Sequence, residues 1–286
     1  MSIAARTSQP IVENESEVLT VFTFWVGDEL FAIDIDNILS VTQDLDKMLQ
    51  PPVKSRGLMG VINYMDEPVA VYNFAEMLNI PSTRQIKSRL VDLLNSYEQD
   101  HVDWVDALEV ALKDNTPFEE PHDAHLCNFG QWYDNFKTRD EALSDIMEHF
   151  DAPHKAIHAL ADELIAMRDN GQLEQAQDKL EQARITSLSS LKKHFSHARN
   201  QIEESLHTVV INITNDGAKP LVALQIDEIH EVMNFEKSDL RGLDRMGLDT
   251  VLEMEGLFRG YLGSQDNRSS CLLLDTTNLL SNIKVS

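Results

Sequence analysis

The hydrophobic pattern of the chain changes twice, and these changes limit the folds that it can adopt. From Val18 to about residue 83, short runs rich in β-branched and aromatic residues alternate with turn signals, a pattern typical of antiparallel strands. Between residues 84 and 206, apolar residues recur at intervals of three and four, which predicts helices. After His207 the strand pattern returns. The sequence therefore predicts one β domain that is split by an inserted helical domain.

The strand regions contain one clear hairpin and several shorter runs. Residues 18–26 and 30–35 flank the turn signal Gly27-Asp28, which predicts the hairpin. Further strands are expected near residues 60–62, 69–72, 209–213, 221–226, 231–233 and 270–275.

The helical region predicts four main helices, at residues 90–112, 122–136, 143–164 and 173–202. Pro153 is expected to open or to kink the third helix, and Asn170-Gly171 to precede the fourth. An even number of antiparallel helices returns the chain to its starting point, as an insertion requires. The expected fold is thus of the α+β class, with an antiparallel four-helix bundle as the insert.

Charge excludes several classes of partner. The chain has 24 Lys and Arg against 48 Asp and Glu, a net charge of −24, which argues against binding to nucleic acid or to anionic lipid. No apolar run reaches the roughly 18 to 20 residues of a membrane span, and residues 1–17 resemble a flexible tail rather than a signal peptide. We therefore expect a cytoplasmic protein without membrane insertion. The two cysteines, Cys127 and Cys271, suit a reducing compartment.

Histidines are concentrated in the helical region. Eight of the ten lie between His101 and His197, and Cys127 lies in the same region. His154 and His158 are four residues apart, so one helical face could present both imidazoles to a metal ion. Taken alone, this spacing is more typical of two histidines on a solvated or partly buried face, and Cys127 alone is equally well explained as an inert buried thiol. His101 shares a helical stripe with Trp104 and faces the expected interior, where an unpaired imidazole is costly.

Three motifs taken together resemble the chemoreceptor zinc-binding domain, a bacterial four-helix sensory module. They are His101-Val102-Asp103-Trp104, Cys127-Asn128-Phe129-Gly130-Gln131-Trp132-Tyr133 and His154-Lys155-Ala156-Ile157-His158. The resemblance covers about residues 90–205. It implies that Zn²⁺ is bound by His101, Cys127, His154 and His158, with Trp104, Gly130 and Trp132 as supporting residues.

Three imidazoles and one thiolate would fill a tetrahedral zinc shell and leave no position for an activated water. The chain also lacks a His-Glu-x-x-His sequence, so we expect no enzymatic activity. A zinc-bound thiolate reacts with oxidants, and the resemblance implies sensing of zinc or of reactive chlorine species. His125 is a possible substitute ligand. His122, His149, His194 and His197 are expected to be solvated or to lie beside the site, and Cys271 to be a small buried residue.

The two β regions together resemble a CheW-like domain, a paired β-barrel adaptor that couples chemoreceptors to the histidine kinase CheA. The resemblance rests on Val21-Phe22-Thr23-Phe24 with Leu30-Phe31-Ala32-Ile33, on Gly60-Val61-Ile62-Asn63 with Pro68-Val69-Ala70-Val71, and on Leu274-Asp275 with Leu279-Leu280. Met65 stands where the family usually has arginine, and methionine cannot replace the donors of a guanidinium. The partner could therefore differ, or the β domain could serve only to hold the bundle.

These observations predict a non-enzymatic chemosensory adaptor with a tail at 1–17, a CheW-like domain at 18–83 and 207–286, and a zinc-binding insert at 84–206. The expected partners are a CheA-type kinase or chemoreceptors, and a homodimer is possible. The alternative is a constitutive scaffold whose zinc only stabilises the insert. A metal-dependent hydrolase is disfavoured because no general base is placed beside the four candidate ligands.

Overall fold

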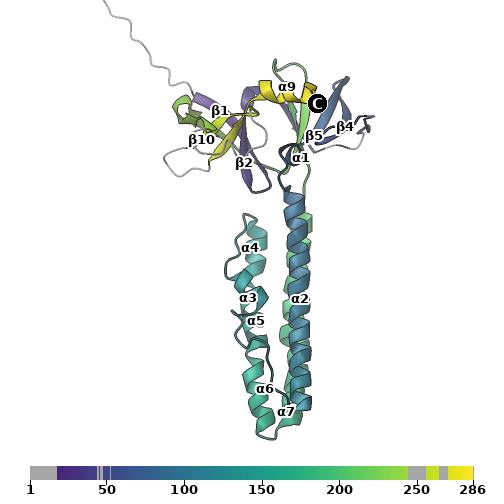
Figure 1. Ribbon diagram of the computed structural model, residues 1–286, viewed down its shortest axis with the longest axis vertical. Helices are drawn as coiled ribbons and strands as arrows, with labels where there is room; N and C mark the ends of the chain where they lie inside the picture. Colours follow the sequence, from purple (N-terminus) through teal and green to yellow (C-terminus); the bar gives the residue numbers. More distant parts are fainter. Residues whose placement is uncertain are drawn as a thin grey trace, which may run out of the picture. The chain divides into compact units, whose positions relative to one another are not determined.

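The computed structural model describes residues 18–43, 45, 48–51, 53–243, 256–263 and 270–285, and only the backbone of 280, 282, 284 and 285. The expected tail, residues 1–17, lies outside the described residues. The protein has a mixed α+β fold and divides into two compact units (Figure 1). One unit comprises Met1–Thr83 and His207–Ser286, and the other comprises Arg84–Leu206.

The first sheet of the β unit combines strands from both segments of the chain. Among the described residues its order is β8-β1-β2-β11-β10-β9. The strands are β1 (Val18–Val26), β2 (Glu29–Asp34), β8 (Glu228–Glu236), β9 (Leu240–Arg241), β10 (Phe258–Leu262) and β11 (Cys271–Leu274). The expected hairpin is confirmed, since β1 and β2 pair antiparallel and Gly27 turns between them with a φ of 59°.

The second sheet is also assembled from both segments, in the order β3-β6-β7-β5-β4. Its strands are β3 (Ile38–Thr42), β4 (Leu58–Tyr64), β5 (Glu67–Asn73), β6 (Val209–Ile213) and β7 (Val222–Ile226). β6 and β7 lie between β3 and β5, so the residues after the helical unit complete a sheet that begins before it. The β unit is therefore a single structure built from two separate stretches of sequence.

Apolar side chains cover both faces of each sheet. One core includes Phe24 and Phe31 of the first sheet together with Ile211 and Leu224 of the second. A separate cluster around Val21 and Leu273 covers the other face of the first sheet, and one around Val71 and Val210 covers that of the second. Each fully buried residue of this size contributes about 1.5–3 kcal/mol relative to an exposed one.

Short helices complete the β unit. They are η1 (Ile35–Asn37), α1 (Phe74–Leu78), η3 (Lys237–Asp239) and α9 (Thr276–Val285). The side chain of Asn73 caps α1 by accepting a hydrogen bond from Glu76 N, and Asn79 ends it with a φ of 57°.

The helical unit begins with one long helix and continues through shorter ones (Figure 1). The elements are α2 (Thr83–Asp114), α3 (Asn128–Tyr133), α4 (Glu141–Glu148), α5 (Asp151–His158), α6 (Leu160–Asp169), α7 (Leu173–Ala183), η2 (Arg184–Leu188) and α8 (Ser189–Glu204). Their apolar stripes form one core that includes Leu94, Leu108, Phe150, Ile157 and Phe195, all fully buried. The periodicity at intervals of three and four is thus confirmed as the buried face of the helices.

The second predicted helix, residues 122–136, is largely wrong. Residues 122–127 form bends and turns, and only α3 is helical. The sequence His122-Asp123-Ala124-His125-Leu126-Cys127 has no repeating apolar face, so packing does not favour a helix there. Pro153 lies in the first turn of α5, where its missing N–H leaves no hydrogen bond unmade.

The last predicted helix is interrupted by η2, a π-helical segment. Arg184 begins this segment and binds Asp106 and Glu109 of α2, each at 2.7 Å. None of the helices within the described ranges has both the length and the apolar composition of a membrane span.

Candidate metal centre

His101 lies on the buried face of α2, where only 3% of its surface is exposed. Its Nδ1 lies 2.6 Å from the carbonyl oxygen of Tyr97, one helical turn earlier. The carbonyl can only accept, so Nδ1 carries the proton and Nε2 has a free lone pair. This buried Nε2 has no hydrogen-bond partner among the residues that the structure describes.

Cys127 is positioned by a tight turn at the start of α3. It is the N-cap residue, and its Sγ accepts a hydrogen bond from Gly130 N at 3.2 Å. Gly130 is required because a Cβ there would lie 1.9 Å from the carbonyl oxygen of Ala124. The absence of a side chain at this position allows the turn of residues 124–127 to pass close to α3 and places the sulfur.

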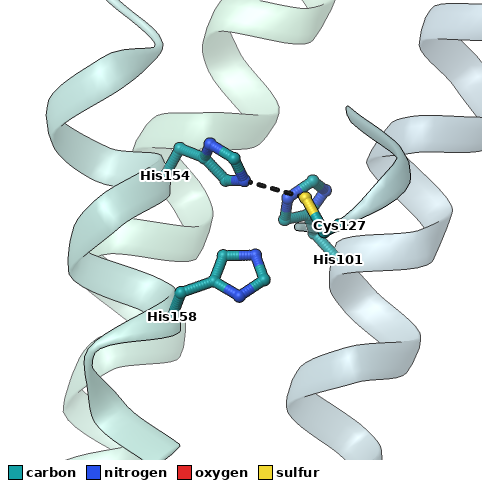
Figure 2. Close-up of side chains that lie close together, drawn as sticks. All are labelled: His101, Cys127, His154 and His158. Carbon is teal, nitrogen blue, oxygen red and sulfur yellow. Dashed lines mark hydrogen bonds between the residues drawn. The ribbon is translucent and has the colours of Figure 1, made fainter. Parts of the chain in front are cut away.

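His154 and His158 come from one face of α5 and are both buried. His154 Nε2 lies 3.2 Å from the sulfur of Cys127 (Figure 2). His158 Nδ1 donates to the carbonyl oxygen of Pro121 at 2.9 Å, and the same oxygen accepts from Trp104 Nε1 at 2.9 Å. The Nε2 of His158, like that of His101, is buried without a partner within the described part of the chain.

The structure brings these four side chains together although they are spread over 58 positions of the sequence. One donor atom from each of His101, Cys127, His154 and His158 lies within 4.8 Å of all the others. Figure 2 shows the rings and the sulfur turned toward one another. The ring of Phe129 packs against those of His101 and His154, with centroids 5.6 and 4.9 Å away.

Burial sets the protonation of the group. Desolvation, together with smaller contributions from the neighbouring imidazoles, lowers the pKa of His154 to about 3 and that of His158 to about 4, the latter against the opposing effect of the Pro121 carbonyl. Desolvation also lowers the pKa of His101, against the opposing effect of the Tyr97 carbonyl. The three rings are therefore neutral at pH 7, the form that binds metal ions. Burial raises the pKa of the Cys127 thiol, although hydrogen bonds from the Gly130 and Phe129 amides oppose the change.

The donor set fits a zinc ion. Zn–N distances of about 2.0–2.1 Å and Zn–S distances of about 2.3 Å place tetrahedral ligand atoms roughly 3.3–3.6 Å apart. The 3.2 Å between Cys127 Sγ and His154 Nε2 is close to this spacing, and all four donor atoms lie within 4.8 Å of one another. The Nε2 atoms of His101 and His158, which lack partners in the described part of the chain, would otherwise carry an uncompensated desolvation cost.

The supporting residues of the motifs have separate roles. Trp104 fixes the Pro121 carbonyl that orients His158, and Gly130 binds the thiol sulfur. Trp132 is farther away and packs on Tyr97 and Phe136. Sequence reasoning missed the carbonyls of Tyr97 and Pro121. That of Tyr97 could have been inferred from its position four residues before His101, whereas nothing in the sequence indicates the contact of Pro121.

The remaining histidines and Cys271 lie outside the cluster. His125 Nδ1 is 2.9 Å from a carboxylate oxygen of Asp134, and half of its side chain is exposed, so this geometry does not support a ligand role. His122 pairs with Asp162, and the rings of His149 and His194 face each other 5.9 Å apart. Cys271 is a buried residue of β11, as expected, and burial raises its pKa to about 12.

Two family models match the chain. Residues 20–109 match the CheW-like domain, and residues 101–165 match the chemoreceptor zinc-binding domain, whose range contains all four residues of the cluster. The chain carries a CheW-like domain and a chemoreceptor zinc-binding domain. These families are signalling and adaptor domains rather than enzyme families.

Two solved structures are similar to the chain. The scaffolding protein TtCheW from Thermoanaerobacter tengcongensis covers 90% of this chain and 88% of its own, with 10% identity and a TM-score of 0.39. The regulatory CZB domain of DgcZ covers 41% of this chain and 98% of its own, with 18% identity and a TM-score of 0.36. A comparison with curated proteins finds no match. Because both TM-scores are low, the assignment rests on the two family models.

The match over residues 20–109 is to the CheW-like domain, a family of chemotaxis adaptors that acts with chemoreceptors and CheA. Met65, where the family usually has arginine, lies in the turn between β4 and β5, and 71% of its surface is exposed. Both Met65 and Asp66 have a positive φ, of 52° and 63°, as in a type I′ hairpin turn. The side chain at position 65 is thus available for contact with another protein.

Proposed function

We propose that the protein is a non-enzymatic chemosensory adaptor in which a zinc-binding insert controls docking by the CheW-like domain. In this proposal, residues 18–83 and 207–286 form the CheW-like domain and residues 84–206 the zinc-binding insert. The interleaving of β6 and β7 between β3 and β5 supports the view that both segments belong to one domain. The burial of both faces of each sheet favours a pair of closed barrels, and the single apolar core of the insert favours an antiparallel four-helix bundle.

The observation that carries the zinc proposal is the pair of buried Nε2 atoms on His101 and His158, which have no hydrogen-bond partner among the described residues. Both rings have their other nitrogen fixed by a backbone carbonyl, which sets the tautomer that leaves Nε2 free to coordinate. With Cys127 and His154 they would hold a structural or sensory Zn²⁺, which supplies a compensating charge and keeps the sulfur as thiolate. Four protein ligands leave no open position for a hydrolytic water.

The thiolate offers a second input, oxidation. A cysteine thiolate reacts with hypochlorous acid to give sulfenic acid and chloride, with two electrons passing from sulfur to chlorine and the oxygen and proton passing to sulfur. A sulfenic acid is a poorer ligand than a thiolate, so oxidation would loosen the hold of Cys127 on the ion. Cys127 is half-buried and lines a cavity, which supports access by a small oxidant.

Hydrogen bonds fix both ends of the insert, which supports a route by which a change at the metal site could reach the β unit. At its base, Lys87 Nζ donates to Ser205 Oγ at 2.7 Å and thereby links the start of α2 to the end of α8. Within the β unit, one oxygen of Asp227 accepts from the backbone N–H of Thr83, the first residue of α2, and from that of Gly27 in the β1–β2 turn. A shift of α2 that moves Thr83 would therefore change the hydrogen bonds that Asp227 makes with this hairpin.

A comparison of Cys127→Ala with His125→Ala tests the proposal in the full-length chain. His125 is the matched control because it lies two residues away and pairs with Asp134 outside the cluster. We expect Cys127→Ala to lose most bound zinc and His125→Ala to retain it. Equal zinc content in the wild type and in Cys127→Ala would overturn the ligand assignment.

Partner binding separates a sensor from a constitutive scaffold. The affinity of the wild type for a CheA-type kinase and for chemoreceptors is measured with zinc, after chelation and after hypochlorous acid. A sensor changes its affinity when zinc is removed. If chelation lowers only the melting temperature and leaves both affinities unchanged, the zinc is structural and the scaffold alternative holds. Light scattering of the same samples tests whether the chain forms a homodimer.

A further inference from the structure

A cavity of about 450 Å³ lies beside the four-residue cluster in the helical unit. Its walls include His101, Cys127 and His158, three of the four candidate ligands. Trp104, Pro121 and Phe129 also line it, together with residues exposed at the surface. The cavity therefore connects the cluster with solvent on the side of α2 and of the turn that leads into α3.

Three carboxylates stand at the solvent side of this cavity. Asp100 and Asp103 flank His101 on α2, and Glu120 precedes Pro121, whose carbonyl orients His158. All three are exposed, and no lysine or arginine is present among the described lining residues. Gln99 Nε2 donates to Asp103 at 2.8 Å, and Asn128 Nδ2 approaches Asp100 at 3.5 Å. Neither amide neutralises the negative charge of its partner.

The inner wall of the same cavity supplies an independent sign of a ligand. His101 and His158 are 3% and 2% exposed, and each has an unpartnered Nε2 within the described part of the chain. Negative charge at the mouth and free lone pairs behind the inner wall together match a cation that enters from solvent and sheds its water as it binds. An anionic ligand would be repelled at the mouth.

We propose that this cavity is the entrance through which a divalent transition-metal ion reaches the cluster, with Asp100, Asp103 and Glu120 as the acidic rim that attracts it. The inference rests on the proposed zinc site and adds its route of loading. Carboxylates beside a low-dielectric wall raise the local concentration of cations and therefore the association rate. For three charges acting on a divalent ion about 10 Å away in water, the effect is on the order of tenfold at low salt.

The test measures metal uptake by the full-length, metal-free protein under reducing conditions. Co²⁺ is the probe, because its thiolate charge-transfer band reports directly on binding to Cys127. Stopped-flow absorbance gives the association rate for the wild type and for the triple variant Asp100→Asn, Asp103→Asn, Glu120→Gln. The matched control is Asp92→Asn, Asp178→Asn, Glu203→Gln, which removes the same charge from exposed positions of the helical unit that do not line the cavity.

We expect the rim variant to bind Co²⁺ about tenfold more slowly at low salt, with the difference shrinking as salt is added. Its release rate into excess chelator should stay within about twofold of the wild type, because the ligands are intact. The control variant should keep an association rate within about twofold of the wild type. An unchanged Co²⁺ association rate in the rim variant, or an equal slowing in the rim and control variants, would overturn the proposal that this cavity is the entrance.

The same experiment distinguishes this failure from failure of the metal site itself. If wild-type protein develops no thiolate charge-transfer band with Co²⁺, the proposed site is wrong and the entrance falls with it. If the band forms in every variant at the same rate, the site stands and only the acidic entrance is rejected.

Discussion

At the scale of single residues, burial prepares the cluster for a metal ion before any ion is bound. The desolvated imidazoles of His154 and His158 hold pKa values of about 3 and 4, so they bring no protons that must be displaced at pH 7. The Cys127 thiol has a pKa raised above its ordinary value of 9.0, so it is protonated in the metal-free chain. Coordination must therefore remove one proton, that of the thiol.

The number of protons released on zinc binding tests this balance. At pH 7.5 we expect about one proton per ion, and an apparent affinity that rises about tenfold for each pH unit between 7 and 8. Because the pKa values of His154 and His158 lie well below 6, these two rings should add no proton to the count at pH 6.0. Calorimetry in two buffers of different ionisation enthalpy gives the count. A release of two or more protons at pH 6.0 would mean that the imidazoles are charged in the metal-free protein.

At the scale of secondary structure, the position of the thiol depends on the close approach of a turn to α3. The hydrogen bond from Gly130 N to the Cys127 sulfur requires that residues 124–127 lie against the helix. This arrangement belongs to a loop and a short helix rather than to the long helix that residues 122–136 were expected to form.

Gly130→Ala is predicted to disturb both the fold and the site. The new Cβ would lie 1.9 Å from the Ala124 carbonyl oxygen, so the turn must move and take the sulfur with it. We expect a loss of about 1–3 kcal/mol in unfolding free energy and at least a tenfold loss of zinc affinity. Gly171→Ala is the contrast, because its Cβ meets nothing within 4 Å and only its φ of 75° is strained. Denaturant unfolding and zinc titration of both variants would contradict the account if Gly130→Ala kept its zinc affinity.

The elements that the sequence predicted best are those with a long or well-bounded apolar pattern. The hairpin of β1 and β2 and the long helix α2 follow directly from period and turn signals. β3 was missed because none of its residues is fully buried, so its sequence carries no alternation. α1 has only five residues, too few to show a helical period, and η2 differs from an α-helix only in its hydrogen bonds.

The site was predictable as a set of residue types and not as a geometry. His101, Cys127, His154 and His158 could be named from motif resemblance, and the structure brings them together. The backbone carbonyls that fix the rings could not be found in this way, because a carbonyl is present at every residue. The position of Pro121 depends on the path of the loop between α2 and α3.

At the scale of the whole molecule, the proposal requires that the state of the insert changes docking by the β unit. Asp227 is the residue best placed for this, since its carboxylate joins the first residue of α2 to the β1–β2 turn. Its negative charge also favours the N-terminus of a helix.

Asp227→Asn is therefore predicted to weaken the response to zinc without loss of zinc. We expect unchanged metal content, a loss of about 1 kcal/mol in stability, and a smaller difference in partner affinity between the zinc-bound and chelated forms. Asp28→Asn is the control. Asp28 is exposed and follows Gly27 in the β1–β2 turn, so the substitution removes the same charge without removing the Asp227 carboxylate. An undiminished zinc response in Asp227→Asn, measured by interferometry against the kinase, would argue against this route.

Met65→Arg tests the docking surface independently of zinc. The side chain is 71% exposed in the β4–β5 turn, so the substitution should not change the free energy of unfolding by more than about 0.5 kcal/mol. Arginine would add the fixed set of donors that the family usually has at this position, and we expect tighter binding to a CheA-type kinase or a chemoreceptor. Unchanged affinity for both would indicate that this turn lies outside the interface.

The central claim is that one zinc ion is held by three imidazoles and one thiolate. X-ray absorption at the zinc edge of the purified full-length protein tests it most directly. We predict about one zinc per chain, with roughly three nitrogen neighbours at about 2.0 Å and one sulfur at about 2.3 Å. A zinc shell without sulfur, or purified protein that does not retain zinc when it is supplied, would contradict the account.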